Sequence, residues 1–349
     1  MKKRKFIFII CLIFNCLLCF CGQKNPKINI WYGEHQSFGK NGIPQQWINI
    51  LGNVTGAQGI DSLYYSLNQG KQQSLSMGPD GRRLAKAGDF NIELDHQELN
   101  IGENEIRIVA VDSAGIRVDR EIHIHYHPQK PNIPQYQVDW ETVRHIQNAV
   151  QVVDGLWKLA QDGIRITEPY YDRALALGDM HWQNYEVTVE VIFHGMRIPR
   201  REQGDRGADV IHVAIATRWP GHDEDGKNLR TKWYPLGATA EFRIEPDWQN
   251  CSWRILGGKG KVTGETTSVR QIMPETRYIM KHRVETLEDS STLYSVKLWK
   301  AAEPEPTGWD LRTQEGPEDI QNGGILLIAH YSVVTFGDIA VSPIYFSSD

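Results

Sequence analysis

Cysteine is nearly absent from the body of this 349-residue chain. Four of its five cysteines lie within the first 21 residues, which leaves Cys251 alone in everything that follows. A single thiol cannot close an intramolecular disulfide, so the fold must be held together without a disulfide framework. Because the sequence places no evident catalytic base beside Cys251, we interpret it as a buried thiol rather than a nucleophile.

Long apolar runs are also missing after residue 20. The one such run, residues 6–20, follows the cations of residues 2–5. It is about fifteen residues long, which is short for a membrane span but suits the apolar region of a secretory signal. We therefore predict a signal peptide over residues 1–21 and export of the rest of the chain. An uncleaved amino-terminal anchor is the alternative, and it would export the rest equally.

The end of this leader, Leu17-Leu18-Cys19-Phe20-Cys21-Gly22, resembles a bacterial lipobox. The resemblance implies lipidation of Cys21, with Cys19 as the other candidate and cleavage elsewhere as the competing interpretation. It also implies a place in the bacterial cell envelope, either lipid-anchored or secreted. Contact with the membrane is then expected only through the lipid.

An excess of positive charge is also missing, since 43 acidic residues outnumber 38 basic ones. The full chain carries a formal charge of −5, and removing the four cations of the leader leaves about −9. Nucleic-acid binding draws on a basic face, so we expect no nucleic-acid partner. The sequence also lacks a G-x-S-x-G elbow, an H-E-x-x-H pair and a phosphate-binding loop, which excludes the enzyme classes that these motifs mark.

Helical periodicity is almost absent, and short alternating segments take its place. Residues 28–127 contain roughly seven of them, separated by turns, which is typical of an immunoglobulin-like sandwich. The pattern N-x-I-x-I-x-A-x-D-x-x-G over residues 104–115 resembles the closing strands of bacterial Ig-like and cadherin-like repeats. Three prolines between Pro128 and Pro134 then predict a semi-rigid linker over residues 128–139.

Histidines alternate along the last segment of this first sandwich, at positions 123, 125 and 127. Neighbours two apart on a strand lie about 7 Å from each other, so only adjacent pairs could share a metal ion. We interpret them as a solvated face rather than a metal site.

Residues 140–349 contain about ten further strand segments with long loops, which predicts a jelly-roll sandwich and an all-β protein. Two stretches carry a more specific likeness. Residues 182–189 (Trp-Gln-Asn-Tyr-Glu-Val-Thr-Val), and the closing pair 323–330 and 333–341, resemble strands of the concanavalin A-like superfamily. Laminin G-like domains and jelly rolls of the 3-keto-disaccharide hydrolase type share these strands. The resemblance implies the fold, and fold alone does not assign function.

Period-two alternation places charged side chains opposite the apolar face of several strands. If those strands share one sheet, its open face gathers a mixture of charges and a tryptophan, which suits recognition of sugar hydroxyls and stacking on a pyranose ring. The alternative is a solvated face with cross-strand ion pairs. The residues concerned are Glu186, Glu190, His212, Arg218, Glu241, Arg243, Arg283, Lys297 and Trp299.

A loop of about twenty residues, from Thr217 to Ala238, is the second candidate for ligand contact. Loops of this length are usually functional or disordered, and a disordered loop is typically poor in aromatic residues. We expect it to overhang the sheet or to pack against it. Its candidate ligand residues are Arg218, Trp219, His222, Trp233 and Tyr234.

A structural calcium ion is implied only by the family resemblance. Asp338 stands where many concanavalin A-like domains hold such an ion, and Asp179 could join it. We expect no other cofactor.

These patterns favour an exported lipoprotein that binds a carbohydrate or a glycosylated surface through the concave face of its second sandwich. One alternative is a glycoside hydrolase or polysaccharide lyase acting on the same face. Its candidate catalytic residues are Glu190, Glu241, His212 and Arg243, with the two glutamates as a potential pair from different strands. The other alternative is a structural adhesin that binds a protein.

Overall fold

The structure is a computed structural model that describes residues 25–344 except 57, 131–132, 208–209, 222–236 and 259. Within this part the regular structure is β, apart from three single turns of 3-10 helix: η1 (His96–Glu98), η2 (Ile146–Asn148) and η3 (Arg201–Gln203). The all-β prediction is confirmed. No helix among the described residues is long and apolar enough to cross a membrane. The predicted lipidation site Cys21 lies outside the described residues.

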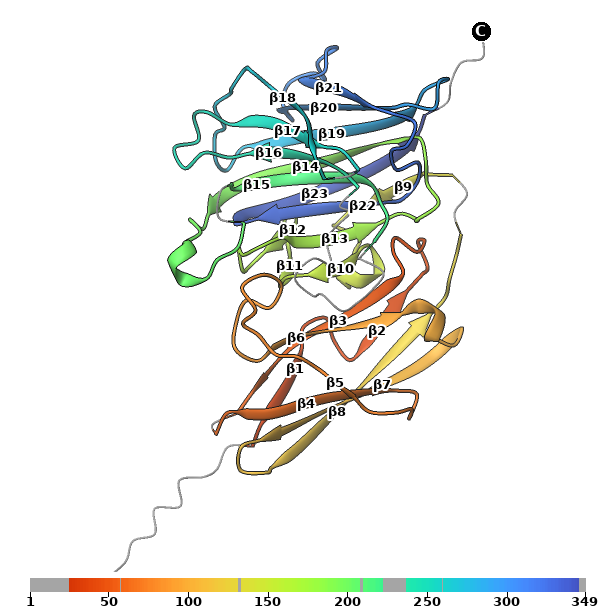
Figure 1. Cartoon of the computed structure of the whole chain (residues 1–349), viewed down its shortest axis with the longest axis vertical. Coiled ribbons are helices and arrows are strands. Elements are labelled where there is room, and N and C mark those ends of the chain that lie inside the picture. Colours follow the sequence, from red (N-terminus) through yellow and green to blue (C-terminus); the bar gives the residue numbers. More distant parts are fainter. Residues whose placement is uncertain are drawn as a thin grey trace, which may run out of the picture.

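Residues 27–126 form a first pair of sheets, in the lower part of Figure 1. One sheet has the order β1 (Lys27–Ile30), β3 (Trp47–Thr55), β6 (Asp89–Asp95). The other has the order β2 (His35–Phe38), β8 (Arg117–Tyr126), β7 (Gly102–Asp112), β4 (Ile60–Leu67), β5 (Gln73–Ser74). The inward residues of both sheets, among them Ile50, Phe90 and Ile106, make one buried core. The immunoglobulin-like class of this sandwich stays a prediction.

The second pair of sheets packs above the first (Figure 1). Its seven-stranded sheet has the order β10 (Gln151–Asp154), β13 (Arg173–Leu177), β22 (Gly324–His330), β15 (His212–Trp219), β16 (Ala238–Arg243), β17 (Ser252–Leu256), β18 (Val262–Glu265). Its eight-stranded sheet has the order β11 (Trp157–Ala160), β12 (Gly163–Ile166), β23 (Ser332–Pro343), β14 (Tyr185–Met196), β19 (Arg277–Thr286), β20 (Thr292–Lys300), β21 (Leu311–Glu315).

The eighth strand of that sheet, β9 (Tyr136–Val138), pairs with β23. It falls inside the segment predicted as linker, so the linker prediction was too long at its carboxyl end. Ile339 of β23 lies opposite Val138 in this pairing, and both are buried. Burial of Val138 against the core explains why the chain joins the sheet as soon as the prolines are passed.

Alternation builds the core between these two sheets. Val187, Val189 and Val191 of β14 are fully buried, as are Val213 and Ile215 of β15. Burying each such side chain contributes about 1.5–3 kcal/mol relative to its exposure to water. The residues between them on each strand must therefore point to the outer face of their own sheet.

The first sandwich packs against the β10 edge of the seven-stranded sheet. Gln151 of β10 donates to the Trp47 carbonyl oxygen at 2.7 Å. The Val153 carbonyl oxygen accepts from Arg83 at 3.2 Å and from Asn91 at 3.0 Å. These contacts satisfy backbone groups that an open sheet edge would leave exposed.

A buried ion-pair network joins the same surfaces. Arg83 Nε lies 2.7 Å from Asp154 Oδ2, and Arg83 Nη1 lies 2.5 Å from Glu93 Oε1. Arg173 Nη1 lies 3.4 Å from the other oxygen of Asp154 and donates to the Arg83 carbonyl oxygen at 3.0 Å. Burial raises the pKa of the Asp154 carboxyl, and the two guanidinium groups oppose that rise. The network fixes the loop around Arg83 beside the start of β13.

Candidate functional site

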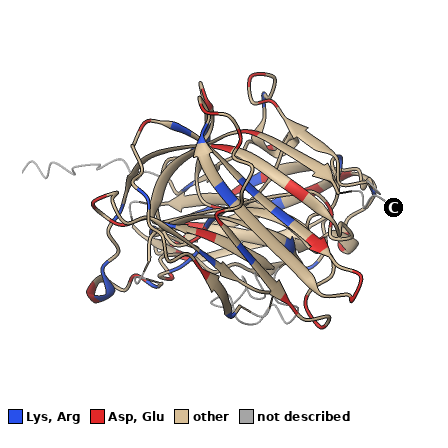
Figure 2. Cartoon of the chain, turned by 90° about the horizontal axis from the view of Figure 1, so that it is seen from above, with Lys and Arg blue, Asp and Glu red and all other residues tan. Residues whose placement is uncertain are grey.

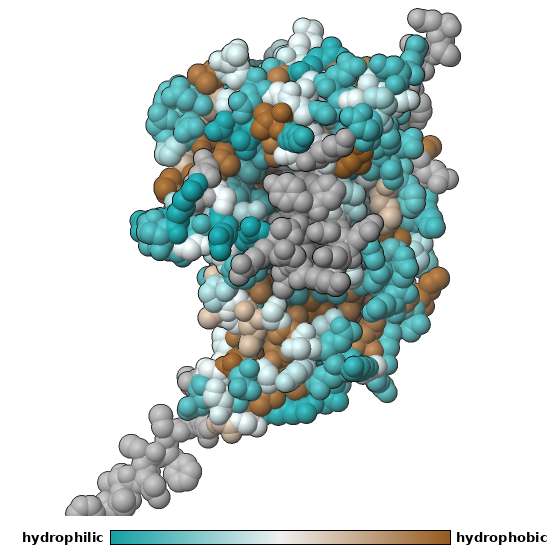
Figure 3. Space-filling view, in the orientation of Figure 1, coloured by the Kyte–Doolittle hydropathy of each residue, from teal (hydrophilic) through white to brown (hydrophobic). Residues whose placement is uncertain are grey.

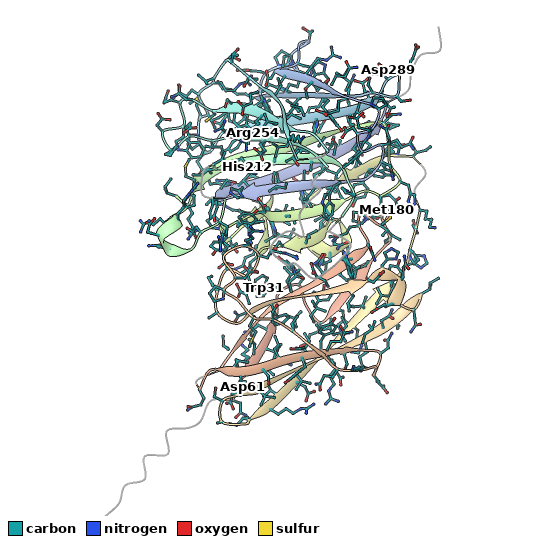
Figure 4. The ribbon with its side chains drawn as sticks, in the orientation of Figure 1. Trp31, Asp61, Met180, His212, Arg254 and Asp289 are labelled. Carbon is teal, nitrogen blue, oxygen red and sulfur yellow. The ribbon has the colours of Figure 1, made fainter. Side chains whose placement is uncertain are left out.

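Sheet register gathers a polar group on the outer face of the seven-stranded sheet. His212 of β15 lies opposite His330 of β22, and Glu241 of β16 lies opposite Arg254 of β17. Directly opposed residues of antiparallel strands project to the same face. Figure 4 labels His212 and Arg254, which lie close together on this sheet. The side chains line a pocket of about 220 Å³ together with Tyr171 and Asp172, which precede β13.

His330 and Asp172 form a buried ion pair at one side of the pocket. His330 Nδ1 lies 2.6 Å from Asp172 Oδ1, and His330 Nε2 donates to the Gly207 carbonyl oxygen at 3.0 Å. Burial alone would lower the pKa of His330, but the Asp172 carboxylate raises it above its usual value. Burial would raise the pKa of Asp172, and the imidazolium lowers it instead. The Tyr171 ring meets His330 edge-on, with centroids 5.0 Å apart.

His212 stacks on this pair as a neutral ring. Its centroid lies 4.6 Å from that of His330, and the two planes differ by 4°. Burial and the neighbouring imidazolium hold the pKa of His212 well below its usual range. Its Nδ1 is buried without a hydrogen-bond partner. Its Nε2 lies 4.0 Å from Glu241 Oε1.

Glu241 completes the group. Arg254 Nε donates to its Oε2 at 2.7 Å, and Arg254 Nη2 makes a second, shorter contact with the same oxygen. Burial raises the pKa of Glu241, although Arg254 opposes the rise. The pocket thus holds two opposite-charge pairs and one neutral imidazole. Buried groups with perturbed pKa values in a cleft are characteristic of functional sites.

Apolar residues, four of them alanines, cover another part of the same face. They form a buried cluster on the outer side of the sheet: Val153, Ala174, Ala176, Ala214, Ala216, Trp219, Leu326 and Ile328. The predicted ligand residue Trp219 therefore presents no exposed ring face to a sugar. Its side chain reaches this face because the register between β15 and β22 shifts after Ala216.

Arg218 does not lie on the open face, contrary to the prediction. Its backbone has φ +51°, at the same irregularity in β15, and the alternation of the strand fails there. The buried guanidinium donates instead to groups in the loops and strand ends at one end of the sandwich: the carbonyl oxygens of Gln183 and Ile320, and the side chains of Asn184, Thr286 and Thr292. Arg218 therefore holds these loops together.

The single open face expected from the sequence is divided between two sheets. His212, Glu241 and Arg243 lie on the seven-stranded sheet, whereas Glu186, Glu190, Arg283, Lys297 and Trp299 lie on the eight-stranded sheet. The shared core separates the two outer faces. Glu190 and Glu241 consequently cannot act as a pair, and Glu190 contacts Arg277 instead, at 2.8 Å.

The eight-stranded face is a network of ion pairs. Glu186 contacts Arg283 at 2.6 Å and Lys281 at 3.3 Å, and Glu305 contacts both Lys281 and Lys297 at 2.8 Å. Trp299 is buried there beneath Lys297. Figure 2 shows the two signs of charge interspersed on the strands of this sandwich rather than gathered apart. This face matches the alternative of cross-strand ion pairs.

An aromatic residue that the sequence did not single out, Trp309, lies on the eight-stranded face. Arg283 stacks over its ring at 5.1 Å, and Lys297 lies at 4.6 Å from its centroid. These cation–π contacts explain the positions of the Arg283 and Lys297 side chains without a bound ligand.

Arg243 lies at the margin of the pocket's face. It is opposite His212 in the β15–β16 pairing and lies 3.7 Å from Glu265 of β18. Arg243 thus shares the face with His212 and Glu241, as the sequence predicted. His222, Trp233 and Tyr234 lie outside the described residues.

The two aspartates proposed for calcium have separate protein partners. Asp179 accepts from the backbone amide of Ile43 at 3.0 Å and contacts His181. Asp338 accepts from the backbone amide of Trp140 at 3.3 Å. Neither belongs to the one cluster of three ligand-type side chains found among the described residues. A calcium ion between them stays a prediction that nothing here supports.

Sequence reasoning missed Tyr171, Asp172, Arg254 and His330. His330 ends the predicted strand 323–330, and Arg254 lies in another of the alternating segments of residues 140–349, so alternation gives each of them a face. What the sequence does not contain is the pairing of β22 with β15 and of β16 with β17, which brings the faces together. Asp172 lies just before β13, outside any strand, so alternation could not predict the direction of its side chain.

No protein family matches this sequence, and neither does any curated protein. Solved structures resemble this chain only remotely. A protein of unknown function with a galectin-like fold from Bacillus subtilis has 11% identity and a TM-score of 0.33, covering 56% of this chain and 86% of its own. The alginate lyase Aly36B has 11% identity and a TM-score of 0.38, covering 62% of this chain and 99% of its own.

Lectin I from Ulex europaeus, solved with the methyl glycoside of α-L-fucose, has 10% identity and a TM-score of 0.27. It covers 60% of this chain and 91% of its own length. At these TM-scores the likenesses are remote.

Proposed function

We propose that this protein binds carbohydrate in the pocket on the outer face of its seven-stranded sheet. The observation that carries the proposal is the convergence of donors and acceptors there from β15, β16, β17 and β22 and from the segment before β13. The charges are already paired, so the pocket offers fixed hydrogen-bonding groups with little net charge. Such a lining suits a ligand rich in hydroxyl groups.

The surface around the pocket supports a polar ligand over a protein partner. Hydrophilic side chains predominate over the second sandwich on the face shown in Figure 3. Only seven large apolar side chains are exposed among the described residues: Ile101, Ile133, Leu159, Ile198, Val262, Val269 and Met273. Protein-docking sites more often present a contiguous apolar patch.

A second candidate function is cleavage of the bound glycan. The observation that favours it is the pairing of a neutral histidine with a carboxyl of raised pKa, His212 and Glu241. Burial raises the pKa of Glu241 toward neutrality, as a proton donor requires, and keeps His212 neutral, the form in which an imidazole accepts a proton. His212 would accept a proton, and Glu241 would donate one.

Binding is tested by titrating the purified chain with neutral and uronate-containing oligosaccharides. The two variants Arg254→Met and Arg283→Met are matched, because each removes an arginine that pairs with one glutamate on an outer sheet face. We expect Arg254→Met to weaken binding about 10- to 100-fold, the value of one charge-assisted hydrogen bond, and Arg283→Met to leave it unchanged. Equal losses in both variants, or no binding by the wild type, would contradict the proposal.

Cleavage is tested on the same oligosaccharides. New reducing ends indicate hydrolysis, and new reducing ends with an ultraviolet-absorbing double bond indicate elimination. If the pocket is catalytic, His212→Asn abolishes turnover while the melting temperature stays near that of the wild type. Binding without any product restricts the function to recognition.

Export and lipidation form a separate part of the proposal, supported by the leader pattern alone. Mass spectrometry of the mature protein from its native host tests it. A chain that begins at Cys21 and carries the mass of a diacylglyceryl group is expected. A chain that begins elsewhere without added lipid would exclude lipidation at Cys21.

A further inference from the structure

Three ligand-type side chains from separate segments lie together in the pocket. Asp172 precedes β13, His212 begins β15 and His330 ends β22, and one ligand atom of each lies within 4.8 Å of the others. All three are buried. No other such group of three exists among the described residues.

His212 supplies an independent sign of a missing partner. Its Nδ1 is buried without a hydrogen-bond partner, and the exposed fraction of the side chain is 7%. A buried polar atom left unsatisfied costs about 1–3 kcal/mol, so native structures rarely retain one without a reason. A bound cation would satisfy this nitrogen.

His330 is held in the orientation that metal ligands need. Its Nε2–H donates to the Gly207 carbonyl oxygen, which leaves Nδ1 directed at Asp172. A ligating histidine almost always donates its other nitrogen to a carbonyl or carboxylate in this way. The second ring has a similar neighbour: Glu241 Oε1 lies 4.0 Å from Nε2 of His212, the ring nitrogen opposite the unpartnered Nδ1.

Gly207 shows how closely the backbone approaches this ring. Its φ is +57°, and a Cβ at this position would lie 2.9 Å from His330 Cε1 and 3.1 Å from Nε2. A larger residue would therefore displace the imidazole and lose the carbonyl contact. The position requires glycine on both steric and conformational grounds.

From this arrangement we propose that Asp172, His212 and His330 bind one divalent transition-metal ion. Two imidazole nitrogens and one carboxylate oxygen suit zinc, iron, cobalt or nickel, whereas calcium prefers oxygen ligands throughout. In the metal-free chain a proton joins Asp172 and His330, and the ion takes its place. Ligand distances of about 2.0–2.2 Å place neighbouring ligand atoms roughly 3.0–3.5 Å apart, so Asp172 and His330 must separate from their 2.6 Å contact to admit the ion between them. The ion would lie in the same pocket as the proposed sugar, but its binding does not depend on a sugar ligand.

The test is a titration of the untagged, metal-stripped full chain with CoCl₂, followed by calorimetry and by visible absorption. We expect one Co²⁺ per chain, an absorption band of cobalt bound to nitrogen and oxygen, and a higher melting temperature. CaCl₂ should produce none of these changes.

Variants locate the ion. His212→Asn and Asp172→Asn should each abolish the cobalt band, and Gly207→Ala should weaken binding about tenfold through loss of the carbonyl contact. The matched control is His125→Asn, which removes one of the exposed histidines of β8 that could bind metal adventitiously. Circular dichroism confirms the fold of each variant.

Absence of a cobalt band in the wild type would overturn the proposal, because no variant is involved in that measurement. Loss of the band in His125→Asn with retention in His212→Asn would also overturn it and assign the binding to the surface histidines. A rise in melting temperature with CaCl₂ but not with CoCl₂ would also overturn the proposal.

Discussion

Histidine side chains occupy three kinds of environment among the described residues. Those on β2 and β8 are largely exposed, with His35 stacked on His123. His330 is buried beside a carboxylate and its pKa rises, whereas His212 is buried beside that cation and its pKa falls. His282 lies in the core between the sheets, where its Nδ1–H donates to the Ile215 carbonyl oxygen at 3.0 Å.

His282 should make the protein sensitive to acid. Burial lowers its pKa from 6.5 to about 4. The unfolded chain therefore takes up a proton below pH 6.5 that the folded chain accepts only near pH 4. The stabilising contribution of the neutral His282 is fully present above pH 6.5. As the pH drops toward 4, the free energy of unfolding falls by about 3 kcal/mol through this residue. Urea unfolding at a series of pH values measures the slope.

The variant His282→Asn keeps a donor near the Nδ1 position but has no titrating group. We expect it to be less stable than the wild type at pH 7 and to lose less stability on acidification. The control is His127→Asn, the same substitution at an exposed position, which should leave the slope unchanged. A wild-type slope that persists in His282→Asn would contradict the assignment.

Alternation within single strands could be predicted from the sequence, and the pairing of strands could not. The inward valines of β14 and the outward His212 and Glu241 lie on the faces that period two assigns to them. Yet β14 and β15 are consecutive along the chain and belong to different sheets. Sheet membership depends on long-range contacts, which no local pattern reports. For that reason one predicted face became two.

Irregular positions account for the other errors. Arg218 and Trp219 follow a shift in register, so each points away from the direction that alternation predicts. Asp172, also with positive φ, precedes its strand. These are places where the backbone conformation, rather than the residue pattern, sets the direction of a side chain.

Arg218 should be a major source of stability for the ends of β14, β15, β19 and β20. Its guanidinium makes five hydrogen bonds to the surrounding loops. Lysine cannot reproduce this forked geometry. We expect Arg218→Lys to lower the unfolding free energy by about 3 kcal/mol, measured by chemical denaturation.

The matched control is Arg144→Lys, since the exposed Arg144 makes only one long hydrogen bond, at 3.4 Å to the Glu141 carbonyl oxygen. That variant should lie within about 0.5 kcal/mol of the wild type. Equal stabilities for the two variants would show that the buried guanidinium contributes little.

The two sandwiches share a polar, buried junction. Arg83 of the first contacts Asp154 of the second, and Tyr32 of the first donates to the Gly155 carbonyl oxygen at 2.6 Å and accepts from the Trp157 amide at 2.9 Å. The junction also fixes the segment before β13 that carries Tyr171 and Asp172. The first sandwich therefore stabilises one wall of the pocket.

We expect the two sandwiches to unfold in one calorimetric transition. Arg83→Met leaves the carboxylates of Asp154 and Glu93 buried with less compensation, which costs about 3–5 kcal/mol. The melting temperature should fall, or the transition should split into two. Arg107→Met, which removes an exposed ion pair with Asp119, should cost about 0–1 kcal/mol. Two transitions in the wild type would contradict the coupling.

The location of ligand binding is tested most directly by hydrogen–deuterium exchange with and without the oligosaccharide that binds tightest. The account predicts slower exchange in β16, β17 and residues 170–173, around the pocket of the seven-stranded sheet. Slower exchange confined to β14, β19 and β20 would place the ligand on the opposite face and contradict it.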